Sequence, residues 1–164
     1  MNERVITIRS SEGIAALHDL WLELGPRDAN ADPAVMATLL QARDDVVRPH
    51  IVVAESAGGR AMLVGRIENV RLPVRLGYRT IYSPRRRALN IVQGGALGDD
   101  GAALAAAFEE ACGALRESEA DVLRLRAVRV GSELHRLASA RASRWNACWR
   151  WRDGPWGRAT WVNP

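Results

Sequence analysis

The sequence predicts an α/β fold in which a mixed, mostly antiparallel and twisted sheet carries helices on both faces. Two observations lead to this prediction. Apolar, β-branched segments alternate with segments of helical periodicity, and their order is strand, two helices, three or more strands, helix, strand, helix and two strands. A chain of 164 residues is the size of one domain with an ample core, so we expect a single domain over residues 1–164.

The first third of the chain predicts one strand and two helices. Residues 4–8 are rich in β-branched side chains, which strands favour. Apolar residues then recur at helical spacing over 10–24, and Gly25-Pro26 ends that helix. Asp32-Pro33 offers an N-cap and a proline at the first helical position, so a second helix is expected over 33–42.

The middle of the chain predicts meandering strands. Residues 50–55 and 61–67 are expected to pair across a turn at Gly58-Gly59. A strand-like region then runs to Gln93, and Pro73 and Gly77 are expected to break it into a hairpin. Within it, three consecutive arginines over 85–87 are expected to form a solvated loop, and residues 94–101 a glycine-rich loop.

The last third predicts a helix, a strand, a short helix and a hairpin. Leu104 to Leu115 carries apolar residues at helical spacing, and 121–130 reads as a strand. Gly131-Ser132 is expected to start the short helix. The chain then closes on a hairpin formed by 145–151 and 156–162.

Composition limits the classes of function. All 23 basic residues are arginine, and the net charge is only +4, so the charge is weak evidence for a nucleic-acid binder. No apolar run approaches the roughly 18 residues of a membrane span. The N-terminal residues show no secretory pattern, so we expect a cytoplasmic protein. Cys112 and Cys148 are expected to be small buried hydrophobes rather than a disulfide framework.

The order of elements resembles that of the GNAT acyltransferases, and the chain is similar to the first half of CelD-like and FemAB-like proteins, which join two GNAT-like halves. The resemblance rests on the strand pair 51–54 and 63–65, the arginine-rich hairpin ending at 93–95, and residues 121–126 followed by 132–134. It implies acyl transfer from acetyl-CoA or another acyl-CoA to an amine or hydroxyl acceptor. It also implies that strand 121–130 lies parallel to the strand ending near Gln93 and splays away from it at one end.

The family's coenzyme-binding segment, Q/R-x-x-G-x-G/A, is degenerate in this chain. Gln93, Gly94, Gly95 and Gly98 are the candidate cofactor-binding residues, but Ala96 stands where the pattern has its first glycine. At the following helix start, Asp99 and Asp100 would cap the backbone amides and repel a pyrophosphate. We therefore expect this chain alone to hold no cofactor tightly.

The resemblance also bears on partners. Where the two-half proteins continue into a second half, this sequence ends, near Trp161. We expect either a fragment or a lone first half that shapes the acceptor groove. Its partner would be the second GNAT-like half or another copy of the chain.

Few residues are arranged for catalysis. His18, His50 and His135 show no metal-ligand spacing, so no metal site is expected. No nucleophile elbow or P-loop is present. The candidates for proton transfer are Glu55, Glu68, Glu133 and His135, with exposed charges on amphipathic elements as the alternative.

The candidate substrate contacts are three arginines and two tryptophans. Arg124 and Arg126 alternate along a strand expected to be central, where they would contact an acidic substrate or form internal ion pairs. Arg79, in the hairpin, is the third arginine. Trp149 and Trp151 share a strand face and would either pack the final hairpin or form a stacking platform.

Three hypotheses follow. The first is the coenzyme-poor half of a GNAT-like acyltransferase that acts on a small-molecule or glycan-type acceptor. The second is a non-catalytic module that binds a polyanion through the arginine loop and the tryptophan hairpin, although we do not expect a specific nucleic-acid complex. The third is a protein-interaction domain that exposes the tryptophan hairpin to a partner chain.

Overall fold

The computed structural model describes residues 4–25, 28–142, 147–151 and 156–162, and for Arg75 and residues from 142 onward it describes the backbone alone. The strands are β1 (Arg4–Ile8), β2 (Val46–Ser56), β3 (Gly59–Arg71), β4 (Val74–Leu76), β5 (Arg79–Tyr82), β6 (Arg85–Leu97), β7 (Val122–Arg129), β8 (Ala147–Trp151) and β9 (Trp156–Val162). The helices are α1 (Ser11–Ala16), α2 (His18–Glu23), the 3-10 turn η1 (Ala29–Ala31), α3 (Pro33–Ala42), α4 (Gly101–Arg116) and α5 (Glu133–Ala142).

The main sheet confirms the predicted fold class. It has seven strands in the order β1-β2-β3-β6-β7-β9-β8, and a separate two-stranded sheet is formed by β4 and β5. All neighbouring strands of the main sheet are antiparallel except β6 and β7, which are parallel. The expected parallel pairing of the strand after α4 with the strand ending near Gln93 is therefore confirmed.

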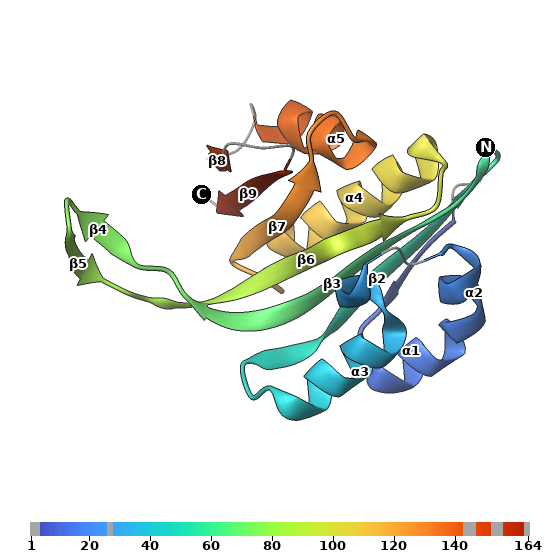
Figure 1. Ribbon diagram of the computed structural model, residues 1–164, viewed down its shortest axis with the longest axis horizontal. Coiled ribbons are helices and arrows are strands. Elements are labelled where there is room, and N and C mark those ends of the chain that lie inside the picture. The colour runs from blue at the N-terminus through green and yellow to red at the C-terminus, as the bar shows by residue number, and fades with distance from the viewer. Residues whose placement is uncertain (1–3, 26–27, 143–146, 152–155, 163–164) are drawn as a thin grey trace.

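Helices cover both faces of this sheet (Figure 1). On one face, α4 and α5 enclose a core that contains Leu63, Phe108 and Leu123. On the other face, α1 to α3 enclose a second core that contains Trp21 and Met62. Met62 and Leu63 are consecutive residues of β3, so the strand's alternation sends them to opposite cores.

The first helical segment differs from its prediction. The expected single helix over 10–24 is two short helices, because the backbone leaves the helical path at Leu17 between α1 and α2. The sequence offers Ser10 or Ser11 as the N-cap of this segment, and the structure selects Ser10, whose side chain accepts a hydrogen bond from the Gly13 amide. The cap of α3 is also confirmed, with Asp32 accepting from the amides of Ala34 and Val35.

The central hairpin corrects two loop predictions. Residues 85–87 are the first residues of β6 and not a loop, although their side chains are exposed as expected. The predicted glycine-rich loop over 94–101 is wrong in part, because β6 continues to Leu97 and α4 begins at Gly101, which leaves residues 98–100 as the loop. Both predictions erred because paired strands tolerate arginine on an exposed edge and glycine at a bulge.

Two further findings concern individual segments. None of the helices within the described residues is long and apolar enough to cross a membrane. Cys112 is free and buried in α4, as expected, and burial raises the pKa of its thiol to about 11. The side chain of Cys148 lies outside the described residues.

Candidate functional site between strands β6 and β7

A cavity opens where the two parallel strands separate. β6 and β7 pair from Ala88↔Val122 to Ile91↔Leu125, and no further pair continues the ladder. Beyond this point, the register of β7 with β9 shifts between Leu125 and Val128. The resulting cavity has a volume of about 250 Å³.

Both strands leave the regular ladder for local reasons. In β7, Ala127 adopts a positive φ of 48°, an uncommon conformation for a residue with a side chain. In β6, the register with β3 jumps from Gly65↔Ile91 to Leu63↔Ala96, so the extra residues of β6 form a bulge. The two irregularities face each other across the parallel pair, which is why the cavity lies there.

The bulge of β6 depends on glycine. A Cβ atom on Gly95 would lie 2.7 Å from the carbonyl oxygen of Val64, which is closer than side chains approach backbone. Gly94 has a φ of 68°, and a Cβ there would lie 2.4 Å from the Cβ of Asp28. These two candidate residues therefore shape the strand itself, while both also line the cavity.

The cavity has an apolar interior and charged residues at its edge. Leu104 and Leu134 of the flanking helices and Ile91 of β6 contribute apolar walls. Exposed Arg126 and Arg129 also line it, as does the half-buried Glu133. Such a lining suits an aliphatic chain with a polar or anionic end.

The start of α4 beside this cavity is closed by a carboxylate. Asp100 is the N-cap, and its Oδ1 accepts hydrogen bonds from the Ala103 amide at 2.6 Å and from the Ser56 hydroxyl at 2.9 Å. The Ala103 amide, with Ser56 after it, holds the pKa of Asp100 below its usual value. Asp99 is exposed next to it. An anionic side chain thus occupies the Ala103 amide and places a negative charge where an anion would otherwise bind at this helix start.

A second hollow of about 320 Å³ lies beside the same stretch of β6. Gln93 lines this hollow and not the cavity between the strands, whereas Gly94 and Gly98 line both. Asp28 and Asp99 also line it. The four candidate cofactor-binding residues are therefore divided between two adjoining spaces, one apolar and one acidic.

Glu68 is a buried structural carboxylate, which corrects the alternative that it is an exposed charge. Its side chain is 2% exposed. One carboxylate oxygen pairs with the Arg66 guanidinium, and the other accepts a hydrogen bond from the Asn90 amide at 2.7 Å. Arg43 adds a guanidinium at 3.8 Å. Glu68 is poorly placed for proton transfer, because both of its oxygens are engaged and its side chain does not line the cavity.

The two candidates at the start of α5 differ in their position. Glu133 lines the cavity and forms an ion pair with Arg136. His135 is not part of the lining, and its Nδ1 accepts a hydrogen bond from the Gly131 amide at 3.3 Å. Glu55, the remaining candidate, lies on β2 and contacts Arg60, away from this cavity. Glu133 is therefore the proton-transfer candidate that the fold brings to the cavity.

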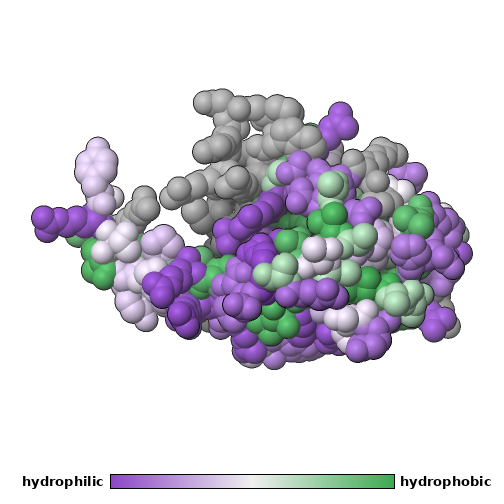
Figure 2. Space-filling model, turned by 60° about the horizontal axis from the view of Figure 1, so that its bottom comes forward, coloured by the Kyte–Doolittle hydropathy of each residue, from purple (hydrophilic) through white to green (hydrophobic). Residues whose placement is uncertain are grey.

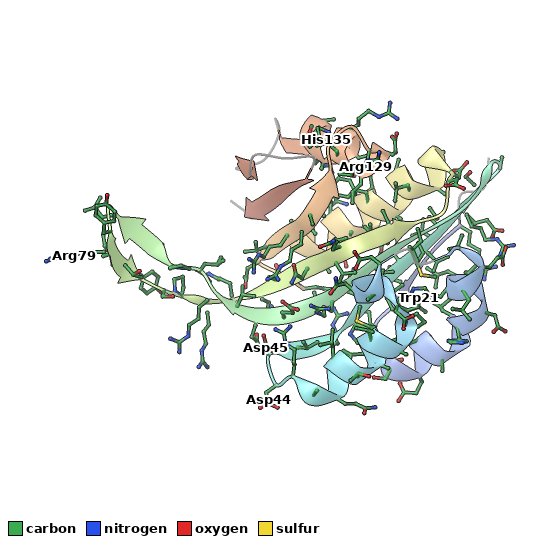
Figure 3. The ribbon with its side chains drawn as sticks, in the orientation of Figure 1. Trp21, Asp44, Asp45, Arg79, Arg129 and His135 are labelled. Carbon is green, nitrogen blue, oxygen red and sulfur yellow. The ribbon has the colours of Figure 1, made fainter. Side chains whose placement is uncertain are left out.

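The predicted substrate contacts are not brought together. Arg124 is half-buried and stands opposite Asn90 in the β6–β7 register, and Arg126 lines the cavity. Arg79 lies on the β4–β5 hairpin, well away from the cavity (Figure 3). Trp149 and Trp151 belong to β8, at the edge of the sheet, and their side chains lie outside the described residues.

Some residues of this region were missed by the sequence analysis. The ion pair of Arg66 and Glu68 had a usable signal, because residues two apart on a strand share a face. Arg129 had none, since it follows the irregular backbone at Ala127. Within the described residues, no cluster of three or more histidine, cysteine or acidic side chains could hold a metal ion.

Comparisons with known proteins complete the description. No protein-family model and no curated protein sequence matches the chain. Among solved structures, the chain is similar to an acetyltransferase from Corynebacterium glutamicum described as histone acetyltransferase HPA2 and related acetyltransferase. The identity is 14%, 100% of this chain and 97% of that chain are covered, and the TM-score is 0.49. It is also similar to the diaminobutyrate acetyltransferase EctA from Paenibacillus lautus, determined with L-2,4-diaminobutyric acid and coenzyme A, at 14% identity over 99% and 96% of the chains and a TM-score of 0.45. The likeness concerns the fold.

Proposed function

We propose that this chain is a GNAT-like acyltransferase domain that shapes the acceptor side of the reaction and does not hold its acyl-coenzyme A tightly by itself. The observation that carries the proposal is the apolar cavity between β6 and β7, directly beside a helix start closed by Asp100. An acyl-coenzyme A has an aliphatic arm and a pyrophosphate. The first fits this cavity, and the second does not fit a carboxylate-capped helix.

Glu133 is the residue we propose for proton transfer. It lines the cavity, whereas both oxygens of Glu68 are engaged by Arg66 and Asn90. A carboxylate in this position can accept a proton from an amine or hydroxyl acceptor if that group reaches hydrogen-bond distance. Exposed Arg126 and Arg129 on the same cavity favour an acceptor, or a donor end, that carries negative charge.

The proposal includes an acceptor groove and a partner that completes one face of the sheet. The polar row of Arg66, Glu68 and Asn90 lies on the sheet face covered by α3, opposite the α4–α5 face. Arg66 Nη1 and Asn90 Oδ1 have no hydrogen-bond partner among the described residues. Such groups on a central strand pair support the idea that this face is completed by a substrate or by a second GNAT-like half.

Calorimetric titration with acetyl-CoA tests the proposal. The wild-type chain is expected to show no binding of micromolar strength. An Asp99→Ser/Asp100→Gly variant is expected to gain binding, because it bares the amides at the start of α4 while glycine still permits an N-cap conformation. A matched control, Asp19→Ser/Glu117→Ser, removes two exposed negative charges elsewhere and should gain nothing. Micromolar binding by the wild type, or no gain in the first variant, would overturn the proposal.

A further inference from the structure

The hairpin that extends beyond the main sheet is a separate arm. We define the arm as residues 72–84, which continue β3 and β6 past their last pair, Arg71↔Arg85. A hydrogen bond from the Leu72 amide to the Pro84 carbonyl, 3.0 Å long, closes its base, and β4 and β5 pair with each other. The arm projects away from the body of the molecule (Figure 1). β4 and β5 make most of their contacts with each other.

One face of the arm is apolar and uncovered. Val74 stands opposite Tyr82 in the register, and Leu76 lies two residues further along the same face. Their side chains are 54%, 62% and 74% exposed, respectively. An isolated two-stranded hairpin is marginally stable in water, and an apolar face of this kind is normally packed against another surface. The projecting arm thus lacks a cover within its own chain.

The arm is also strongly basic. Arg75 and Arg79 lie within the arm, and four more arginines flank it in the strand ends at its base. Residues 71–87 thus contain six arginines and no acidic residue, so the rest of the chain has a net charge of −2, which is +4 minus 6. Arg71, Arg79, Arg85 and Arg86 are exposed, and none of them forms an ion pair with the described residues. Figure 2 shows strongly hydrophilic and hydrophobic side chains side by side on the arm. A surface that covers it should therefore be both acidic and apolar.

The body of the same chain carries such a surface. Where α3 meets β2, Asp44 is exposed and forms no ion pair with the described residues, and the nearby Val47 is 51% exposed. Asp45 lies between them in sequence, and its carboxylate is paired with the Arg43 guanidinium, so Asp44 is the carboxylate of this surface that can meet a partner's arginine. We call Asp44, Asp45 and Val47 the acidic corner. Figure 3 places Asp44 and Asp45 at the end of the body from which the arm projects. The arm cannot fold back onto its own corner while it continues β3 and β6 outward.

We propose that the arm is a dimerisation element, with its apolar face covered by a second copy of this chain and its arginines set against that copy's acidic corner. A two-fold arrangement makes the contact reciprocal, so that each arm lies on the other copy's corner and the assembly closes at two chains. Arginines alone would also suit a nucleic acid, but a phosphate backbone would leave Val74, Leu76 and Tyr82 in water. The inference does not depend on the proposed acyl transfer.

Analytical ultracentrifugation of the full chain tests the apolar contact. The wild type is expected to be a dimer at micromolar concentration. Leu76→Ser/Tyr82→Ser should raise the dimer dissociation constant by about a hundredfold, because two large apolar side chains lose their cover. Leu22→Ser, which changes a side chain 51% exposed on α2, should leave the dimer intact. As a folding control, the arm variant and the wild type are unfolded by heat at high dilution while the loss of secondary structure is followed. An unchanged unfolding transition shows that the body of the variant still folds.

A charge exchange tests the acidic corner. Arg79→Asp or Asp44→Arg alone should weaken the dimer, and the two changes combined in one chain should restore it, because each interface then regains opposite charges. If the combined variant does not regain the dimer, the acidic corner is not the surface that the arm contacts.

Other outcomes overturn the arm itself. These are a monomeric wild type, a Leu76→Ser/Tyr82→Ser variant that still dimerises, and a dimer lost only with Trp161→Ser in the final hairpin. A monomer that binds duplex DNA in a salt-dependent manner, with the binding abolished by Arg79→Asp, would replace the second copy with a nucleic acid.

Discussion

His50 is buried on β2 with no hydrogen-bond partner for either ring nitrogen among the described residues. The nearest carboxylate, that of Glu119, is 3.8 Å from Nδ1. Burial lowers the pKa of His50 from 6.5 to about 4, and the nearby Arg48 adds to the shift while Glu119 opposes it. The fold therefore accepts the neutral imidazole and disfavours the charged one.

This residue predicts a pH dependence of stability. Between pH 6.5 and about 4, the unfolded chain takes up a proton at His50 and the folded chain does not. The stabilisation is therefore present above pH 6.5 and is lost as the pH falls towards 4, by about 3 kcal/mol in total. Urea unfolding of the wild type and of His50→Leu across this range measures it.

The quantity to compare is the slope of the free energy of unfolding against pH in each variant. His50→Leu should lose less stability on acidification than the wild type, whereas His18→Leu, which changes an exposed histidine on α2, should keep the wild-type slope. Equal slopes for the wild type and His50→Leu would show that His50 is not held neutral by the fold.

At the scale of the elements, the bulge of β6 is the feature that opens the cavity. It depends on Gly95, where a Cβ would contact backbone, and on the positive φ of Gly94. α4 contains a glycine of a different kind. A Cβ on Gly113 would meet only the Arg116 guanidinium, at an ordinary distance of 3.5 Å.

These two glycines predict changes of opposite sign. Gly95→Ala should destabilise the fold by about 1–3 kcal/mol, since a methyl group is forced against the Val64 carbonyl. Gly113→Ala should stabilise it by about 1 kcal/mol, because alanine favours a helix interior. Thermal and urea unfolding of both variants measures the difference. If Gly95→Ala stabilised the fold, the bulge could not bring Gly95 into close contact with the Val64 carbonyl.

The elements also show what the sequence could predict. Caps and apolar periodicity were sufficient for α3 and α4, and β-branched segments for β1 to β3, because these signals are local. The sequence could not predict that β6 runs through 94–97, since a bulge is held by the partner strand and not by local propensity. The arm was predicted as a hairpin but not as a projection, because burial depends on the whole fold.

For the whole molecule, the fold class followed from the order of elements, and the parallel pair of β6 and β7 was expected from the family resemblance. The residues of the candidate site were predicted from the sequence only in part. Gly94, Gly95 and Gly98 were identified from the family pattern, and Glu133 from its place at a helix start, and the cavity brings them together. Arg79 was assigned to the substrate, but it lies on the projecting arm, away from this cavity. The positions of these residues depend on how segments far apart in the sequence pack in the fold, which local sequence patterns do not show.

We propose that the cavity between β6 and β7 takes the aliphatic arm of an acyl-coenzyme A, and that Asp100 at the adjoining helix start prevents tight binding of the pyrophosphate. Amide resonances during an acetyl-CoA titration test it most directly. In Asp99→Ser/Asp100→Gly, the predicted shifts are concentrated in Ala102 and Ala103 of α4 and in the cavity residues Ile91 and Val128. The wild type should show none at the same concentration. Equal shifts in the wild type, or shifts of the variant elsewhere on the molecule, would contradict the claim.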